Sequence, residues 1–322
     1  MSLDKSLCLG WIGLGSMGLA MATNIQKYLI ANDMPSLCYS NRTLSRGDSL
    51  QEIGGVPCQS VGELVQMCDV ILISVSNDEV LKGIVKEILN SGDITGKIIV
   101  DTTTVHPTTS ATISSQLQEA HASFIAAPVF GATPLAQAGK LLSAVAGPSN
   151  AIQKISPFLK GVIARNVIQV GHEPSKALLL KTTSNYITAG LMYLISEAHV
   201  FAEKSGLPAD VLETLIGENF GAMALSDSQR MTQGIYYPAE GEKPYSDLGL
   251  GMKDVGIGLE IAKEKGMRLG VGELVWAAME QARGFGERKG RQLDSSGMFG
   301  AVRTDAGLQF KTEGVKKRDG IE

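Results

Sequence analysis

Short apolar runs alternate with segments of helical periodicity over the first 130 residues, and this alternation constrains the fold more than any other feature of the sequence. Strands that alternate with helices of about 10–15 residues predict βαβ units and a parallel sheet. The run 70–75 is apolar throughout, which indicates a strand buried on both faces. The predicted strands are 7–12, 37–40, 70–75, 98–100 and 124–129, and the predicted helices between them are 17–29, 79–89 and 108–119.

The pattern changes after residue 171, where the strand signals stop. From 174 to 204 the only internal helix breaker is Gly190, so we predict one continuous helix of about 30 residues, roughly 45 Å long. A helix of this length exceeds a small domain, and we expect it to join two domains. Further helices are predicted at 209–219, 253–265 and 272–283.

The composition is typical of a globular protein of about two domains. Apolar residues make up 44% of the 322 residues and charged residues 19%. The formal net charge is −4 and aromatic residues are 5%, so we expect no nucleic acid and no membrane among the partners. No N-terminal run resembles a membrane span or a signal peptide, and a cytoplasmic location is therefore expected.

The four cysteines, Cys8, Cys38, Cys58 and Cys68, all lie in the first fifth of the chain, and none forms a CxxC pair. We interpret them as reduced thiols in the hydrophobic core. The four histidines are scattered without a metal-ligand spacing, so no metal site is expected.

Residues 13–18 fit the pattern GxGxxG at the point where the first predicted strand meets the first predicted helix. In this context the motif predicts a dinucleotide site. Gly13 permits a tight turn, Gly15 lets the backbone approach a pyrophosphate, and Gly18 allows the helix to pack closely on the strand. The pyrophosphate would meet the N–H groups at the helix N-terminus. The predicted cofactor-binding residues of this loop are Gly13, Leu14, Gly15, Ser16, Met17 and Gly18.

The residues after the second predicted strand indicate which dinucleotide binds. An NAD site usually carries Asp or Glu there to bind the ribose 2′-hydroxyl, but this chain has Asn41, Arg42 and Thr43 and no carboxylate among residues 40–46. A guanidinium binds a 2′-phosphate with paired N–H bonds. We therefore predict NADP(H), with Arg42 as the main determinant and Asn41 and Thr43 as supporting groups. The alternative is that Arg42 is an ordinary solvated turn residue.

Residues 13–25, GLGSMGLAMATNI, resemble the GxGxMGxxMAxNL motif of the β-hydroxyacid dehydrogenase family, which includes 3-hydroxyisobutyrate dehydrogenases and glyoxylate/succinic semialdehyde reductases. Further blocks follow in the family's order, and the resemblance covers nearly the whole chain. These blocks are DTTTVHP at 101–107, APVFGA at 127–132, KTTSN at 181–185 and the weaker LGMKD at 250–254.

The resemblance implies an α/β fold, with an N-terminal Rossmann-type doubly wound parallel sheet joined by a long helix to an all-α C-terminal domain. We expect the dinucleotide-binding domain at 1–172 and the helical substrate and dimerisation domain at 173–310. Residues 311–322 are charged and contain glycine, and we expect them to be a disordered tail.

The matching blocks also imply roles for residues that follow the predicted strands, where ligands of parallel sheets bind. Thr104 falls on a threonine beside the nicotinamide ribose, and Lys253 falls on a lysine that reaches the cofactor. The cofactor-binding set is completed by Val75, Ser76, Thr104 and Lys253, and the substrate-binding set comprises Thr103, Phe130, Gly131, Ala132 and Asp254.

The chain departs from the family at Phe130, where a substrate-binding serine is common, and at Ala132, which replaces a glycine. A phenyl ring cannot hydrogen-bond a carboxylate, but the backbone N–H groups of Gly131 and Ala132 can cradle one. The alternatives are a larger or less polar substrate, or a Phe130 side chain that simply packs in the core.

Lys181 and Asn185 match the family's catalytic KxxxN motif, and their spacing places both side chains on one face of a helix. The resemblance implies reversible hydride transfer between NADP(H) and a small aldehyde, semialdehyde or 3-hydroxy acid. Lys181 would act as general acid/base and Asn185 would hydrogen-bond the substrate or the lysine.

Two other functions stay open. Imine reductases have a similar architecture but often carry Asp or Tyr at the position of Lys181, so the lysine favours carbonyl chemistry. A non-catalytic NADP-binding scaffold is the third alternative. Apolar residues on all sides of the long helix predict burial against a second copy, and we expect a homodimer through the helical domain.

Overall fold

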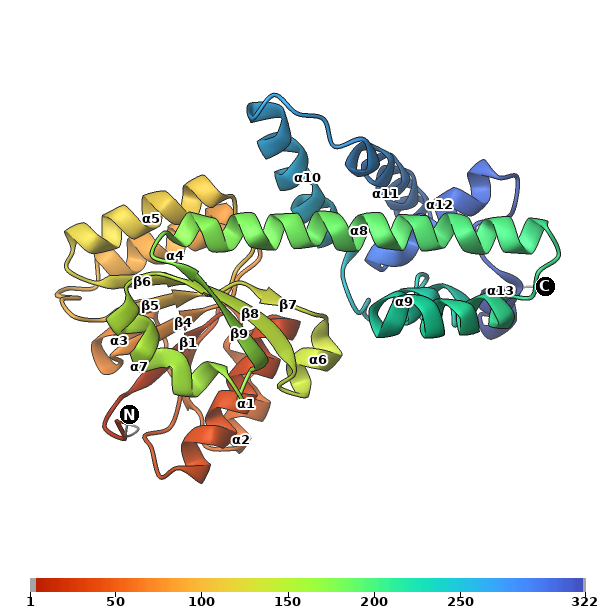
Figure 1. Ribbon diagram of the computed structural model, residues 1–322. Coiled ribbons are helices and arrows are strands. Elements are labelled where there is room, and N and C mark those ends of the chain that lie inside the picture. Colours follow the sequence, from red (N-terminus) through yellow and green to blue (C-terminus); the bar gives the residue numbers. More distant parts are fainter. Residues whose placement is uncertain (1–3, 321–322) are drawn as a thin grey trace. The chain divides into compact units, whose positions relative to one another are not determined.

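The computed structural model describes residues 4–320, which form two compact units (Figure 1). The first unit ends at Lys181 and the second begins at Thr182, so the boundary falls inside the long helix α8 (Pro174–Lys204). The bounds of α8 are those predicted for the long helix. No helix among residues 4–320 is long and apolar enough to cross a membrane.

The first unit contains a sheet whose first six strands are all parallel and lie in the order β3-β2-β1-β4-β5-β6. This order reverses between β1 and β4, as in doubly wound dinucleotide-binding sheets, so the predicted fold class is confirmed. The strands are β1 (Leu9–Ile12), β2 (Cys38–Ser40), β3 (Val56–Pro57), β4 (Val70–Ile73), β5 (Ile98–Asp101) and β6 (Ser123–Ala126).

Three further strands make the sheet mixed rather than purely parallel. β8 (Leu141–Ala146) is antiparallel to both β6 and β7 (Val129–Phe130), and it is parallel to β9 (Ala164–Gly171). The predicted strand 124–129 is therefore divided between β6 and β7, and β8 and β9 were not among the predicted strands.

Successive residues of the strands enter two separate hydrophobic layers. In β1, Leu9 and Trp11 pack into one layer, and Ile12 packs into the other. This alternation is the two-residue period of a strand. The first layer is completed by α1 (Ser16–Ala31), α2 (Asp48–Glu52), α6 (Thr133–Gln137) and α7 (Ser149–Leu159), and the second by α3 (Val61–Met67), α4 (Asp78–Leu89), α5 (Pro107–Glu119) and the start of α8.

The carboxyl ends of β1, β2 and β4 are tied together by backbone hydrogen bonds. The Gly13 N–H donates to the carbonyl oxygen of Ser40, and the Ser74 N–H donates to the carbonyl oxygen of Ile12. The loops that follow these three strands therefore lie side by side, at the point where the strand order reverses. Ligands of open parallel sheets bind at this position.

The second unit is helical and has its own hydrophobic core. The three helices predicted after α8 are each present but longer than expected, and α9 is broken at Gly221, whose φ is +82°. Besides the remainder of α8, the elements are α9 (Ala209–Thr232), α10 (Leu248–Glu264), α11 (Gly270–Arg288), η2 (Ser295–Gly297), α12 (Met298–Asp305) and α13 (Glu313–Arg318).

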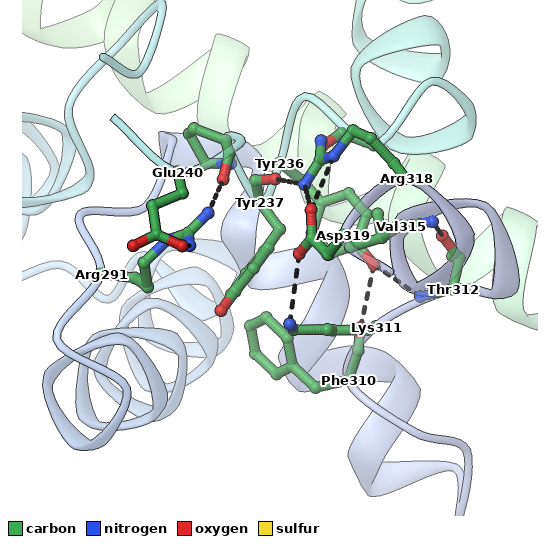
Figure 2. Close-up of polar contacts among 12 residues, drawn as sticks. Tyr236, Tyr237, Glu240, Arg291, Phe310, Lys311, Thr312, Val315, Arg318 and Asp319 are labelled. Carbon is green, nitrogen blue, oxygen red and sulfur yellow. Dashed lines mark hydrogen bonds and ion pairs between the residues drawn. The ribbon is translucent and has the colours of Figure 1, made fainter. Parts of the chain in front are cut away.

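The prediction of a disordered tail from residue 311 is wrong for the residues that the structure describes. Helix α13 lies there, and Val315 is 1% exposed. Figure 2 shows the polar contacts that hold this segment. The Tyr236 hydroxyl accepts from the Thr312 N–H at 2.8 Å and donates to the Phe310 carbonyl at 3.0 Å. Residues 321 and 322 of the predicted tail lie outside the described residues.

Arg318 is the main polar anchor of α13. Its guanidinium donates to the carbonyl oxygens of Tyr237 at 2.8 Å and Gly234 at 3.1 Å, and it also pairs with Asp319 (Figure 2). We expect Arg318→Ala to lower the free energy of unfolding by about 1–3 kcal/mol, because two partly buried carbonyls lose their donor. Urea denaturation measures this loss. The exposed Lys317→Ala is the matched control, and equal stabilities of the two variants would contradict the assignment.

Candidate functional site

The three glycines of the GxGxxG motif have different roles: Gly13 and Gly15 lie between β1 and α1, and Gly18 lies in the first turn of α1. Gly13 has a φ of +96°, and a Cβ atom there would lie 2.2 Å from the carbonyl oxygen of Ser74. A Cβ atom at Gly18 would lie 2.2 Å from the carbonyl oxygen of Gly13. At Gly15 no such neighbour lies within 4 Å. Packing therefore requires glycine at positions 13 and 18, whereas Gly15 leaves open space beside its backbone.

This open space adjoins the N-terminus of α1, where Gly15 is the N-cap residue. Gly15 has no side chain to cap the helix, and the first turn contains no acidic residue. A helix N-terminus carries partial positive charge and attracts anions. The glycine loop consequently fits a pyrophosphate, which needs both backbone access and a positive environment.

Two side chains hold the glycine loop in place. The indole Nε1 of Trp11 donates to the Gly13 carbonyl at 2.9 Å, and Asn41 Oδ1 accepts from the Leu14 N–H at 2.9 Å. Asn41 Nδ2 also donates to the Thr43 carbonyl at 2.7 Å. Asn41, which the sequence predicts as a nucleotide ligand, joins the glycine loop to the loop after β2 through these contacts. Trp11 was missed, because a tryptophan within an apolar strand is typical of a core residue.

Arg42 and Thr43 follow β2 and are exposed. The backbone bond from Gly13 to Ser40 keeps this loop beside the glycine loop. Since residues 40–46 contain no carboxylate, the charge beside this end of the site is positive.

The predicted residues after β4 and β5 are linked to each other. The Val75 N–H donates to Thr103 Oγ1 at 3.1 Å, and the Thr103 N–H donates to Asp101 Oδ1 at 3.0 Å. Thr103 is buried, so its contacts position the loop that carries Val75. Ser76 is exposed and Thr104 is half-buried, both next to these anchored residues.

Lys181 and Phe130 meet within the first unit. The Lys181 ammonium lies 5.1 Å from the centroid of the Phe130 ring, and the lysine side chain is buried. The face of an aromatic ring attracts a cation at this distance. Phe130 therefore contacts the predicted catalytic group itself and is not merely a packing residue of the core.

The backbone after Phe130 is fixed by a glycine requirement. Gly131 has a φ of +128°, and a Cβ atom there would lie 2.9 Å from the Leu141 side chain. Ala132 has extended backbone and is the N-cap residue of α6. The predicted carboxylate cradle at Gly131 and Ala132 thus lies directly beside the aromatic ring that faces Lys181.

Asn185, Lys253 and Asp254 come together in the second unit. Asn185 Nδ2 donates to Asp254 Oδ2 at 2.7 Å, and Lys253 Nζ lies 3.1 Å from Asp254 Oδ1. Asp254 therefore orients the amide of Asn185 and balances the charge of Lys253. Asn185 lies one helical turn after Lys181 along α8.

A cavity in the first unit lies away from these residues. An open cavity of about 450 Å³ between α4 and α5 is lined by Lys82, Thr108 and Gln116 among others, and none of the predicted site residues borders it. Within residues 4–320, no group of three or more His, Cys, Asp and Glu side chains is arranged to hold a metal ion.

Comparison with known families finds two domain models on consecutive parts of the chain. Residues 8–171 match the NAD binding domain of 6-phosphogluconate dehydrogenase. Residues 176–301 match the model described as NAD-binding of NADP-dependent 3-hydroxyisobutyrate dehydrogenase. Together the two matches cover most of the first unit and most of the second, and both models describe domains of dehydrogenases.

Known relatives and solved structures are similar to this chain over nearly its full length. The NADH-dependent oxidoreductase ucdB of Aspergillus ustus is 29% identical, over 92% of this chain and 99% of the relative. Glyoxylate/succinic semialdehyde reductase 1 of Arabidopsis thaliana is 28% identical, over 91% and 98%. A 3-hydroxyisobutyrate dehydrogenase from Salmonella typhimurium has the same fold, with a TM-score of 0.78 at 20% identity over 91% and 99%.

The glycine loop supplies a matched pair of variants. Gly15→Ala should weaken binding of the nicotinamide dinucleotide about tenfold, or about 1.4 kcal/mol, without changing stability, because its Cβ fills only open space. Gly18→Ala should instead lower the free energy of unfolding by about 1–3 kcal/mol through overlap with the Gly13 carbonyl. Calorimetric titration and thermal denaturation separate the two effects. Normal affinity of Gly15→Ala would exclude a ligand from this part of the loop.

Proposed function

Because the chain belongs to the β-hydroxyacid dehydrogenase family, and is thus a dinucleotide-dependent oxidoreductase acting on CH–OH groups, we propose that it interconverts a small aldehyde or semialdehyde and the corresponding hydroxy acid with NADP(H). The single observation that carries this proposal is the buried Lys181 ammonium, which faces Phe130 and lies one turn before Asn185. These two residues stand at the positions of the family's catalytic motif.

A bound nicotinamide supplies or accepts the hydride, and the residues of this chain handle the charge and the proton. When a carbonyl group is reduced, negative charge develops on its oxygen. The Lys181 ammonium stabilises this charge and donates a proton to the oxygen, and in the reverse direction the neutral amine accepts the proton. The Phe130 ring interacts with the same ammonium without accepting its proton.

Asn185 acts as a neutral hydrogen-bonding group beside the reacting oxygen. Because Asp254 accepts one of its amide N–H bonds, the orientation of the amide is fixed. Asp254 is therefore a positioning residue. Lys253, which pairs with the same carboxylate, stands at the position of the family's lysine that reaches the cofactor.

Phe130 bears on the substrate class. A phenyl ring beside Lys181 offers apolar contact where a serine would offer a hydroxyl to a carboxylate. The backbone N–H groups of Gly131 and Ala132 are the proposed donors to a substrate carboxylate. Substrates with an apolar group next to the carbonyl are favoured by this arrangement.

The experiment that tests the function follows NADPH absorbance with glyoxylate, succinic semialdehyde, methylmalonate semialdehyde and a cyclic imine. We expect turnover of at least one carbonyl compound. Turnover of the imine alone would favour the imine reductase alternative. Firm NADPH binding without turnover of any of the four would favour the scaffold.

Lys181→Ala should lower kcat by about 10²–10⁴-fold, which is the usual contribution of a positioned proton donor. Its affinity for NADPH should stay unchanged, as measured by titration of nucleotide fluorescence. Lys176→Ala is the matched control, because Lys176 lies on the same helix, is exposed and pairs only with Glu173 in the structure. Retention of most turnover in Lys181→Ala would remove the lysine from the mechanism.

Arg42→Ala should raise the KM for NADPH by about 10–100-fold, since hydrogen bonds to a charged group contribute about 1.5–3 kcal/mol. The KM for NADH should change little, because NADH has no 2′-phosphate. Arg46→Ala, in the same exposed loop, serves as the control. Equal losses with both nucleotides would show that Arg42 does not select between them.

The second unit exposes a row of large apolar side chains that supports the proposed homodimer. Ile187, Leu194 and Phe201 are 60%, 61% and 74% exposed, and their spacing of seven residues places them on one side of α8. Val211 and Leu215 add a similar pair on α9. Exposed apolar patches of this kind are typical of association surfaces.

Leu194→Asp should convert the protein from a dimer to a monomer at micromolar concentration, because a charge would be buried in the contact. Light scattering after gel filtration measures the mass directly. Met67→Asp, at an exposed apolar position of the first unit, is the control. A wild-type protein that elutes as a monomer would contradict the proposal.

A further inference from the structure

Three of the four cysteines converge in the second hydrophobic layer of the first unit. Cys38 is the first residue of β2, Cys58 directly follows β3, and Cys68 is the C-cap residue of α3. All three are buried in the same cluster of side chains, whereas Cys8 is half-buried and lies outside it. We call Cys38, Cys58 and Cys68 the thiol cluster.

The missing side chain of Gly10 creates the space for this cluster. Gly10 and Cys38 are direct partners in the β1–β2 ladder, so their Cβ positions lie on the same face of the sheet. A Cβ atom at Gly10 would lie 3.0 Å from Cys68 Sγ and 2.5 Å from the Leu64 side chain. The Cys68 sulfur therefore sits over Gly10, next to Cys38.

Cys58 approaches Cys38 from the other side. The Cys58 N–H donates to the Tyr39 carbonyl at 2.8 Å and continues the β2–β3 ladder, in which Cys38 pairs with Val56. Cys58 is thus two residues beyond the partner of Cys38. From ordinary strand spacings the two Cα atoms are about 8 Å apart, which is too far for a disulfide without backbone movement.

The environments of the three sulfurs are unequal. The pKa of Cys38 is lowered to about 7, mainly by a hydrogen bond with the Cys68 thiol. Burial acts in the opposite direction and raises the pKa, whereas a hydrogen bond with Cys58 lowers it further. Burial raises the pKa of Cys58 to about 12, and the hydrogen bond with Cys38 raises the pKa of Cys68. The negative charge of Glu63 opposes ionisation of Cys38 but does not reverse the order. Cys38 is thus the one thiol of the cluster whose pKa is lowered.

The cluster is connected to the nucleotide loop through one short strand. β2 runs from Cys38 to Ser40, and the Ser40 carbonyl accepts from the Gly13 N–H at 3.0 Å. The next residue, Asn41, accepts from the Leu14 N–H. A displacement at Cys38 is therefore transmitted to the glycine loop within three residues.

We propose that the thiol cluster is a peroxide-sensitive site, in which Cys38 is oxidised, Cys68 closes a disulfide with it, and the nucleotide site loses affinity. No metal-holding arrangement involves these thiols within residues 4–320. Because Cys38 is only 6% exposed, the oxidant is a small hydroperoxide such as hydrogen peroxide.

The chemistry takes two steps. The Cys38 thiolate attacks the O–O bond of the hydroperoxide, an S–O bond forms, and the leaving alkoxide takes a proton to give an alcohol, or water from hydrogen peroxide. The Cys68 sulfur then attacks the sulfenic sulfur of Cys38, the S–S bond forms, and hydroxide leaves with the Cys68 proton as water. Two thiols lose two electrons and two protons in total, and the hydroperoxide is reduced.

The test treats the full chain with hydrogen peroxide and maps its peptides without reduction. We expect a peptide pair linked through Cys38 and Cys68, and an NADP(H) Kd raised about tenfold and restored by a thiol reductant. Cys68→Ser should instead accumulate a sulfenic acid at Cys38 that dimedone traps. Cys8→Ser is the control and should behave as the wild type.

Several outcomes would overturn the proposal. They are modification of Cys8 before the cluster, a Cys38–Cys58 link, or a Cys38–Cys68 link that leaves the Kd unchanged. Cys38→Ser and Cys38→Ala are both measured, with a thermal melt of the reduced proteins, so that misfolding of one variant does not decide the result. The mapping needs no turnover, and failure of the reduced protein to bind nucleotide would count against the proposed function and not against the thiol chemistry.

Discussion

The rest of the first unit depends on the contacts that the carbonyl group of Gly13 makes. It accepts the Trp11 indole N–H, and α1 passes it so closely at Gly18 that no side chain fits between them. A buried carbonyl needs a hydrogen-bond donor, and the indole provides one from within the core. This contact sets where α1 starts, and it thereby places the N-terminus of that helix next to the open space at Gly15.

The strand order of the sheet leaves space for a ligand next to this contact. Because the strand order reverses between β1 and β4, the helices that follow these strands pack in opposite layers, α1 in the first and α4 in the second, and leave room at the carboxyl ends of the strands. The Gly13 N–H bonds to the end of β2 and the Ser74 N–H bonds to the end of β1, and these bonds fix the positions of both loops relative to the strand ends. Core packing and ligand binding thus use the same few backbone groups, and a change in one is felt in the other.

Much of the fold could be predicted because it follows from strong local signals. The long helix was predicted at 174–204 and has those bounds, since no proline or glycine interrupts it except Gly190. β9 was not predicted, because most of its side chains are exposed and polar residues such as Arg165 and Gln169 hide the strand pattern. The helix α13 escaped prediction because its one buried residue, Val315, stands among charged neighbours.

The candidate site likewise has parts that could be predicted from local motifs and parts that could not. The glycine loop was predicted from its spacing between a strand and a helix, and the pair Lys181 and Asn185 was predicted from the resemblance to the family's KxxxN motif, since both motifs are local. The partners of Asn41 and Asn185 lie 27 and 69 residues away along the chain, so their contacts could not be predicted from a single sequence. The Trp11 indole was overlooked for another reason, because its bond to Gly13 depends on the turn geometry rather than on a motif.

The Asp254 carboxylate has one oxygen toward Asn185 and the other toward Lys253. The amide of Asn185 and the ammonium of Lys253 therefore share a single carboxylate. Evolution cannot adjust either group independently at this position. A substitution at Lys253 would also disturb the carboxylate that orients Asn185, and this shared dependence restricts the substitutions that either position tolerates.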